Sequence, residues 1–131
     1  TARGDRRFLT SLLHGTMANA YPQALGIKLA MPERPVIAPC GDGGMTRLMG
    51  ALPTLVPEEI PVKLLIYNNS SLGFVEMEQR VEGMLDSYTS LKNPDFAALA
   101  RTIRIEGTRV EAAGDLEGGM RDWRAAEGPD A

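Results

Sequence analysis

Two apolar segments, each followed by a short polar sequence, constrain the fold of this chain more than any other feature. Residues 36–40 lead into Gly41-Asp42-Gly43-Gly44, and residues 62–67 lead into Asn68-Asn69. Each apolar segment has the composition of a buried strand, and a segment of helical length separates them. Strands joined in this way lie parallel, so we expect both polar sequences at the same edge of one sheet, where open α/β sheets bind ligands.

The rest of the chain continues the alternation of strands and helices. The pattern predicts helices over residues 18–30, 45–56, 72–81, 94–102 and 116–126, and strands over residues 36–40, 62–67 and 107–110. This order predicts an α/β domain, a doubly wound parallel sheet with helices on both faces. Pro39 in the first strand cannot donate a ladder hydrogen bond. Pro53 disfavours the interior of helix 45–56 by about 3 kcal/mol, and Arg47 opposes the dipole of its first turn.

Composition narrows the class of protein. At 131 residues with 44% apolar content, the chain corresponds to one domain that can bury its own core. The formal net charge of −3 argues against nucleic-acid binding. The single cysteine, Cys40, excludes an internal disulfide and suits a reducing compartment, so we expect a cytoplasmic location. No apolar run approaches the roughly 20 residues that cross a bilayer.

The two polar sequences contain residue types that suit a divalent cation carrying a diphosphate. Asp42 offers a carboxylate and Asn69 an uncharged amide oxygen, which are the hard donors that Mg²⁺ prefers. Gly43 and Gly44 let the backbone approach phosphate, and a helix beginning near Met45 would direct its positive end there. Judged on Gly41-Asp42-Gly43 alone, an ordinary turn aspartate is the better explanation, and the alternative for Asn69 is an asparagine in a loop.

Together the two halves resemble the thiamine diphosphate (ThDP) motif, in which GDG is followed about two dozen residues later by NN. The likeness extends to residues 14–20, 22–26, 32–34, 68–75, 93–97 and 109–111. The chain is therefore similar to the C-terminal, diphosphate-binding domain of ThDP-dependent enzymes. Within that family its motifs are most similar to the pyruvate oxidase branch, which includes pyruvate dehydrogenase (quinone).

The resemblance assigns roles to individual residues. It implies that the cofactor is held by Gly15, Thr16, Met17, Asp42, Gly43, Gly44, Asn69, Ser71, Leu72, Gly73 and Phe74. Mg²⁺ would be bound by the side chains of Asp42 and Asn69 and by the backbone carbonyl of Ser71. Phe74 falls where related enzymes keep an aromatic near the substrate, although a packing aromatic is an equal alternative. Met17 resembles the apolar residue that bends the cofactor, although such a methionine is more often core.

The resemblance also implies an activity and partners. The expected reaction is oxidative decarboxylation of pyruvate, with electrons passing through FAD to a quinone. The alternatives are a part of acetolactate synthase or of another 2-oxo acid decarboxylase, and a non-catalytic remnant acting as a binding module. The resemblance implies a homo-oligomer, a tetramer in the intact family, in which a partner subunit's pyrimidine-binding domain completes each site. The intact enzyme would be cytoplasmic or peripheral at the inner membrane face.

Both ends of the sequence suggest a fragment. The chain begins with Thr1 instead of Met, and it stops after Gly128-Pro129, where the resemblance implies one more apolar strand. We therefore expect residues 1–131 to be the ThDP- and Mg²⁺-binding domain alone, truncated at both ends. The pyrimidine-binding and FAD-binding domains would be absent, so FAD would belong to the parent enzyme and the isolated chain would be inactive.

Overall fold

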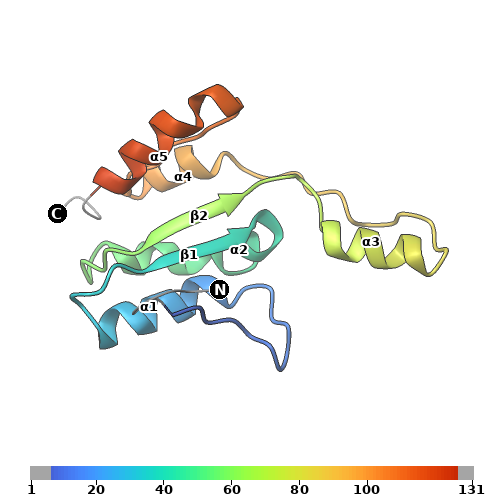
Figure 1. Cartoon of the computed structure of the whole chain (residues 1–131), viewed down its shortest axis with the longest axis horizontal. Helices are drawn as coiled ribbons and strands as arrows, with labels where there is room; N and C mark the ends of the chain where they lie inside the picture. The colour runs from blue at the N-terminus through green and yellow to red at the C-terminus, as the bar shows by residue number, and fades with distance from the viewer. Residues whose placement is uncertain (1–6, 127–131) are drawn as a thin grey trace.

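The computed structural model describes residues 7–126, in which helices alternate with two strands (Figure 1). In chain order the elements are α1 (Ala20–Ala30), β1 (Ile37–Gly41), α2 (Asp42–Leu48), the 3₁₀ helix η1 (Met49–Leu55), β2 (Lys63–Tyr67), α3 (Gly73–Val81), α4 (Phe96–Thr102), the 3₁₀ turn η2 (Ala113–Asp115) and α5 (Leu116–Ala125). The predicted α/β class is confirmed. Residues 1–6 and 127–131, on which the expectation of truncated ends depends, lie outside the described residues.

The strands β1 and β2 pair in parallel, as their apolar sequences predict. Their register runs from Ile37 opposite Lys63 to Gly41 opposite Tyr67. Both strands therefore end at the same edge of the sheet, and α2 and the loop before α3 start there (Figure 1). This edge brings the two polar sequences together.

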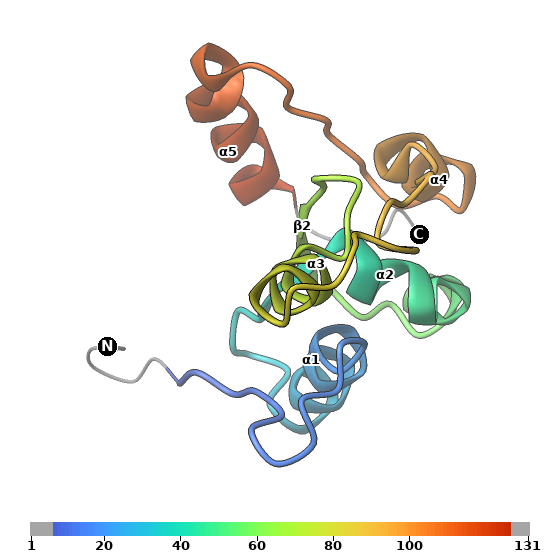
Figure 2. The same ribbon diagram turned by 90° about the vertical axis from the view of Figure 1, so that its right-hand side faces the viewer.

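Side chains that alternate along the strands face different partners. Ala38 is buried with Ala24 of α1, and Leu64, next to it in the register, packs against the same cluster. The main core cluster contains Tyr21, Met45, Leu52, Leu55 and Ile60, with residues of α4 against it. On the other side, Lys63 reaches the end of α5. Figure 2 shows α5 and α2 on opposite sides of β2.

Pro39 is tolerated because β1 pairs with a strand on one side only, and the nitrogen of Pro39 faces the other side. The Lys63 N–H donates to the Val36 carbonyl at 3.0 Å. In a parallel ladder, residues of one strand point their N–H groups alternately toward and away from the neighbour. The nitrogen of Pro39 therefore lies on the outer edge of β1, where a missing N–H breaks no bond to β2.

The single helix predicted over residues 45–56 is wrong in both its start and its type. The α-helix starts at Asp42 and ends at Leu48, and a 3₁₀ helix with Pro53 inside it continues to Leu55. The proline ring clashes with the carbonyl of residue i−4 in an α-helix, which here is Met49, the residue at which the 3₁₀ helix begins. The apolar spacing still places Leu52 and Leu55 in the core.

The strand predicted over residues 107–110 is also wrong, since the described residues form no strand there. The outer edge of β2 is instead occupied by α5. The Trp123 indole Nε1–H donates to the Leu64 carbonyl at 3.2 Å. Lys63 Nζ donates to the carbonyls of Trp123 and Ala126 at 2.7 and 2.6 Å. Because α5 already bonds to the Leu64 carbonyl at the outer edge of β2, residues 107–110 have no free strand edge with which to pair.

The remaining helices start within two residues of the predicted positions. α1 starts at Ala20 instead of 18, and α4 starts at Phe96 instead of 94. Asp95 caps α4, because its Oδ1 accepts a hydrogen bond from the Ala98 N–H at 2.9 Å. That backbone bond lowers the pKa of Asp95. Among the described residues, no helix has the length and apolar character that a bilayer span requires.

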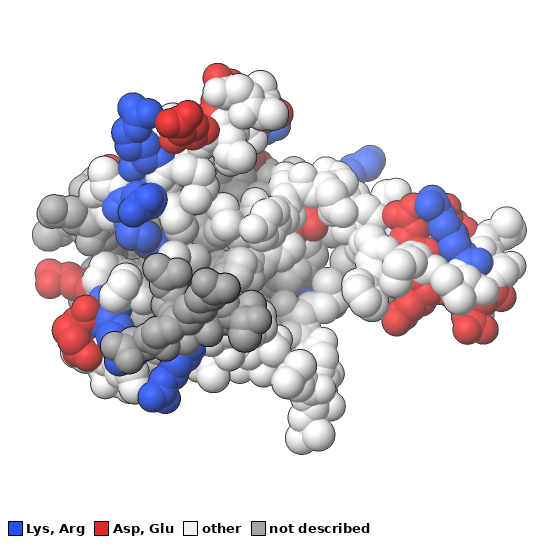
Figure 3. All heavy atoms as spheres, in the orientation of Figure 1, with Lys and Arg blue, Asp and Glu red and all other residues white. Residues whose placement is uncertain are grey.

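α3 projects away from the rest of the fold as an arm (Figure 1). Its exposed side chains include Phe74, 75% exposed, and Val81, 76% exposed. On the face seen in Figure 3, side chains of both charge signs gather on this arm, while the surface between it and the sheet is mostly uncharged. The arm is thus a mixed apolar and charged surface next to the edge where the strands end.

Candidate cofactor site

The first half of the site is the junction between β1 and α2. Gly41 is extended, with φ −78° and ψ 161°, and the chain turns into the helix at Asp42. Asp42 is only 2% exposed. Its carboxylate lies in the first turn of α2, where the partial positive charge of the helix end favours an anion.

The Asp42 carboxylate reaches across to the segment that follows β2. Its Oδ1 accepts from the Gly43 N–H at 2.9 Å. Its Oδ2 accepts from the Ser70 N–H at 2.8 Å and from the Asn93 side-chain amide at 2.6 Å. Asp42 is therefore the residue that joins the two strand ends and a third segment.

The second half of the site is the loop from Asn68 to Leu72. Asn69 Oδ1 accepts from the Ser71 N–H at 3.1 Å, which forms a local turn. Ser70 adopts φ +57°, the left-handed region that a non-glycine residue rarely occupies. The bond from its N–H to Asp42 holds this conformation. The loop is thus constrained by the residue whose carboxylate it faces.

A third segment, residues 89–93, supports the loop from outside. Leu72 N–H donates to the Thr89 carbonyl and Leu91 N–H to the Ser70 carbonyl, each at 2.8 Å. These antiparallel bonds bring Asn93 to Asp42. The sequence analysis included Asn93 in a matching segment but gave it no role.

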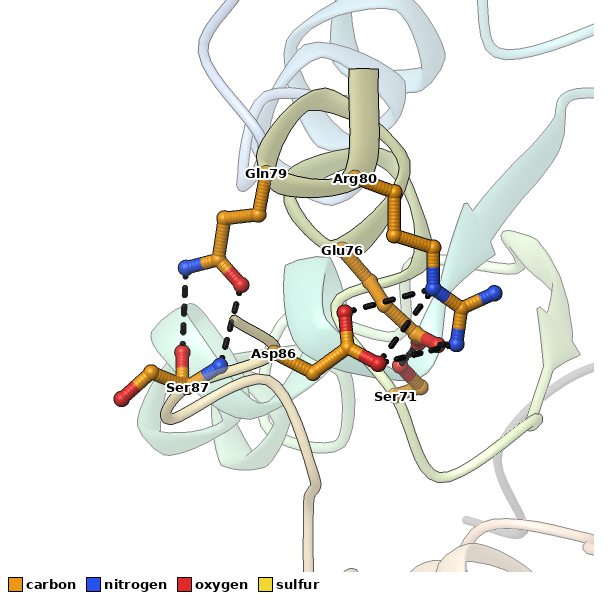
Figure 4. A network of polar contacts seen from close by, with 6 residues as sticks. All are labelled: Ser71, Glu76, Gln79, Arg80, Asp86 and Ser87. Carbon is orange, nitrogen blue, oxygen red and sulfur yellow. Dashed lines mark hydrogen bonds and ion pairs between the residues drawn. The ribbon is translucent and has the colours of Figure 1, made fainter. Parts of the chain in front are cut away.

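Side chains of α3 fix the arm to the same loop, as Figure 4 shows. The Ser71 hydroxyl donates to Glu76 Oε2 at 2.7 Å. Arg80 pairs with Glu76 and with Asp86, the latter at 3.0 Å. Gln79 exchanges two hydrogen bonds with the backbone of Ser87, both at 3.1 Å. Ser71 therefore has its side chain committed to α3, which leaves its backbone carbonyl as its group available to a ligand.

A groove of about 880 Å³, named here the edge groove, opens between these segments. It is lined by Gly15, Met17, Gly41, Asp42, Gly43, Gly44, Tyr67, Asn68, Asn69, Ser71, Leu72, Gly73, Phe74, Val75 and Glu78. This volume is in the range of small-molecule sites. The lining brings together every residue that the sequence analysis assigned to the cofactor, except Thr16. Thr16 is exposed beside the groove, and its carbonyl accepts from the Asn19 N–H.

Two of the glycines lie in close packing, and Gly44 is the one that faces backbone. A Cβ on Gly44 would lie 2.5 Å from the Met17 carbonyl oxygen. A Cβ on Gly43 would lie 2.6 Å from a methyl of Leu72 and 3.1 Å from the Met17 Cε. The segment before α1 therefore lies directly on α2. Gly44 has no room for a side chain because the backbone of Met17 lies against it, a reason that the sequence pattern does not reveal.

Cys40 precedes this groove and is not among the residues that line it. Burial raises the pKa of the Cys40 thiol, so the reactive thiolate is disfavoured. The sequence analysis also expected a strand-end residue at this position.

Comparison with protein families decides what kind of site this is. Residues 1–130 match the family described as thiamine pyrophosphate enzyme, C-terminal TPP binding domain. The chain belongs to this family. Thiamine pyrophosphate is another name for ThDP, so the match agrees with the motif resemblance.

Individual relatives are much longer than this chain. It is 41% identical over 112 residues to YdaP of Bacillus subtilis strain 168, covering 86% of the chain and 20% of YdaP. It is 34% identical over 130 residues to the mitochondrial acetolactate synthase catalytic subunit of Saccharomyces cerevisiae, and the match covers 98% of this chain and 19% of that protein. The fold is similar to that of the ThDP-dependent 4-hydroxybenzoylformate decarboxylase of Rhodococcus jostii RHA1, with a TM-score of 0.78 and 29% sequence identity. The match covers 88% of this chain and 22% of the decarboxylase. The chain spans about a fifth of these proteins.

The donor set of this family member fits a hard cation bound together with a diphosphate. Asp42, Asn69 and the Ser71 carbonyl offer oxygen atoms only, which suits Mg²⁺. The described residues contain no group of three His, Cys, Asp or Glu side chains that could hold a metal by themselves. A cation here would need further oxygen ligands, and phosphate groups supply them in many Mg²⁺ sites. The chain's own residues therefore favour joint binding of the cation and the diphosphate.

Proposed function

We propose that this chain is the ThDP- and Mg²⁺-binding part of an enzyme that converts 2-oxo acids, of the acetolactate synthase type. The observation that carries the proposal is the buried Asp42 carboxylate bonded to the loop of Asn69 and Ser71 beside the edge groove. The yeast relative named acetolactate synthase aligns with 98% of the chain. Because the chain spans about a fifth of such relatives, the activity of a whole enzyme remains part of this proposal.

In this proposal the chain binds and orients the cofactor. Asp42, Asn69 and the Ser71 carbonyl hold Mg²⁺, and the backbones of Gly43, Gly44, Leu72 and Gly73 border the diphosphate. When bound, ThDP supplies the nucleophilic carbon and the electron sink that decarboxylation of a 2-oxo acid requires. Met17 contributes an apolar side chain that is 43% exposed at the groove, against which the cofactor would bend.

Phe74 is proposed as the aromatic residue on the substrate side. It lines the groove and is 75% exposed, so in this chain its ring has little packing of its own. An exposed aromatic at the rim of a groove suits contact with a bound molecule better than a core role.

Oxidation of pyruvate through FAD to a quinone is the second candidate. It is supported by the residues at 15–17 and 72–75, which resemble the pyruvate oxidase branch. The relatives named acetolactate synthase favour the first candidate. In both cases we propose that a partner subunit's pyrimidine-binding domain completes the site in a homo-oligomer, and that the isolated chain does not decarboxylate pyruvate.

Calorimetric titration with ThDP, with and without Mg²⁺, tests the proposal. We expect binding that requires Mg²⁺ and is lost in Asp42→Ala. Because Asp42 also holds the loop, Asn69→Ala provides a second variant in which a mostly exposed side chain is removed. Gln23→Ala, on the exposed side of α1, is the control and should bind like the original chain. Absence of Mg²⁺-dependent binding in the folded original chain would contradict the proposal and favour a non-catalytic remnant.

A further inference from the structure

The side-chain amide of Asn93 lies between two residues of the candidate site. It is 2.6 Å from Asp42 Oδ2 and 2.9 Å from Asn68 Oδ1. An ionised carboxylate can only accept hydrogen bonds, so the atom facing Asp42 must be the NH₂ group of Asn93. The same NH₂ group has two protons, which match the two acceptors.

This contact determines which oxygen of Asp42 can bind something else. Oδ2 accepts from Ser70 and Asn93, while Oδ1 accepts only from the Gly43 N–H among the described residues. A carboxylate has roughly four acceptor positions, two on each oxygen. Oδ2 is therefore saturated, and the remaining acceptor position is on Oδ1.

The same contact explains the first asparagine of the Asn68-Asn69 pair, to which the sequence analysis gave no role. Asn68 Oδ1 accepts from Asn93 and from the Ser70 N–H, the latter at 3.2 Å. Asn68 and Asn69 both line the edge groove. Asn68 Oδ1 is committed to Asn93 and Ser70, whereas among the described residues Asn69 Oδ1 accepts only from the Ser71 N–H of its own turn.

We propose that Asn93 is a positioning residue of the cation site. It orients the Asp42 carboxylate and anchors Asn68, so that Oδ1 and the loop are set before any ligand binds. This inference rests on the proposed function, because it concerns the same cation and diphosphate. Groups that hydrogen-bond to ligating carboxylates commonly tune metal affinity by 10–100-fold.

Three variants test the role of Asn93 in the chain as it stands. Asn93→Asp keeps the shape but replaces the donor with a second carboxylate against Asp42. Asn93→Ala removes the donor without adding charge. Gln23→Glu makes the same amide-to-carboxylate change on the exposed side of α1 and is the matched control. Each variant is measured for Tm, for ThDP affinity by calorimetry, and for the Mg²⁺ concentration that gives half-maximal ThDP binding.

We expect the Mg²⁺ midpoint to rise more than tenfold in Asn93→Asp and several-fold in Asn93→Ala, with no change in Gln23→Glu. A merely structural residue would lower Tm while leaving the midpoint of the folded protein unchanged, and that result would overturn the inference. Unchanged midpoints in both Asn93 variants, with normal binding by the original chain, would overturn the inference and leave the proposed function intact. No binding by the folded original chain would overturn both.

Discussion

The Asp42 Oδ2 atom accepts a hydrogen bond from the Ser70 backbone nitrogen at 2.8 Å, across 28 positions of sequence. This bond joins the ends of β1 and β2 on the side where the edge groove opens. The bond stabilises the backbone conformation of Ser70, whose φ of +57° is unfavourable for a residue with a side chain. Asp42 therefore shapes the loop in addition to offering an oxygen to a cation.

Substitutions of Ser70 test this constraint. Ser70→Gly should leave the free energy of unfolding within about 0.5 kcal/mol, because glycine adopts positive φ without steric cost. Ser70→Val should lower it by roughly 1–3 kcal/mol, because a β-branched side chain is poorly tolerated there. Urea denaturation measures both. Equal stabilities of the two variants would show that the loop does not keep this conformation in solution.

The paired glycines after Asp42 should respond differently to alanine. A Cβ on Gly44 meets the Met17 carbonyl, part of a backbone that cannot rotate away, so Gly44→Ala should cost roughly 1–3 kcal/mol. A Cβ on Gly43 meets the ends of the Leu72 and Met17 side chains, which can move, so Gly43→Ala should cost less.

Gly50→Ala is the control for these two variants, because nothing lies within 4 Å of a Cβ there. It should be neutral or slightly stabilising, since alanine restricts the unfolded chain more than glycine does. Chemical denaturation of all three variants gives the order of stabilities. Greater destabilisation by Gly43→Ala than by Gly44→Ala would contradict the packing of Met17 on α2.

The sequence predicted the parts of the fold that depend on local pattern. Both strands and the ends of α3 and α5 lie within about one residue of their predicted positions, because apolar periodicity determines them. The strand predicted at 107–110 failed because it needed a free edge on β2. That edge depends on Trp123 and Lys63, which are distant in sequence and gave no local signal.

The candidate site divides in the same way. Asp42 and Asn69 were identified from the motif, and the parallel strands bring their segments to one edge. The sequence analysis did not predict the contact between Asn93 and Asp42. Antiparallel hydrogen bonds of residues 89–91 place Asn93 there, and those residues show no clear alternation of apolar and polar side chains. A polar residue whose role is to hold another polar residue carries no periodic signal of its own.

Tyr21 should make stability depend on pH in the alkaline range. Its hydroxyl donates to the Ala51 carbonyl at 2.7 Å, and burial raises its pKa to about 12. In the unfolded chain the pKa is near 10. Because the folded pKa is higher, the stabilisation is complete below pH 10 and is lost as the pH rises from 10 toward 12.

Tyr21→Phe should remove that pH dependence and lower the free energy of unfolding by about 1 kcal/mol at pH 7, through loss of one hydrogen bond. Urea denaturation of both proteins between pH 7 and pH 11 provides the measurement. Tyr67, which is 63% exposed, gives the control variant Tyr67→Phe. An identical alkaline decline in the original chain and Tyr21→Phe would assign the decline to other groups.

The attachment of α5 to β2 should depend on Lys63. Its ammonium donates to the carbonyls of Trp123, Arg124 and Ala126 at the C-terminal end of the helix, where a positive charge is favourable. It also lies 5.6 Å from the centre of the Trp123 ring. Lys63→Met keeps the apolar stem and removes every one of these contacts, so it should lower the free energy of unfolding by roughly 1–2 kcal/mol.

Trp123 is the only tryptophan in the chain, so its fluorescence reports this attachment directly. We expect a red-shifted emission in Lys63→Met at temperatures where circular dichroism still shows the folded sheet, because the end of α5 separates before the core unfolds. Lys92→Met, an exposed lysine beside the loop, is the matched control and should leave both the emission and Tm unchanged. If Lys63→Met leaves the emission as it is in the original chain, α5 is held to β2 by contacts other than Lys63, with the Trp123 bond to Leu64 as the first to test by Trp123→Phe.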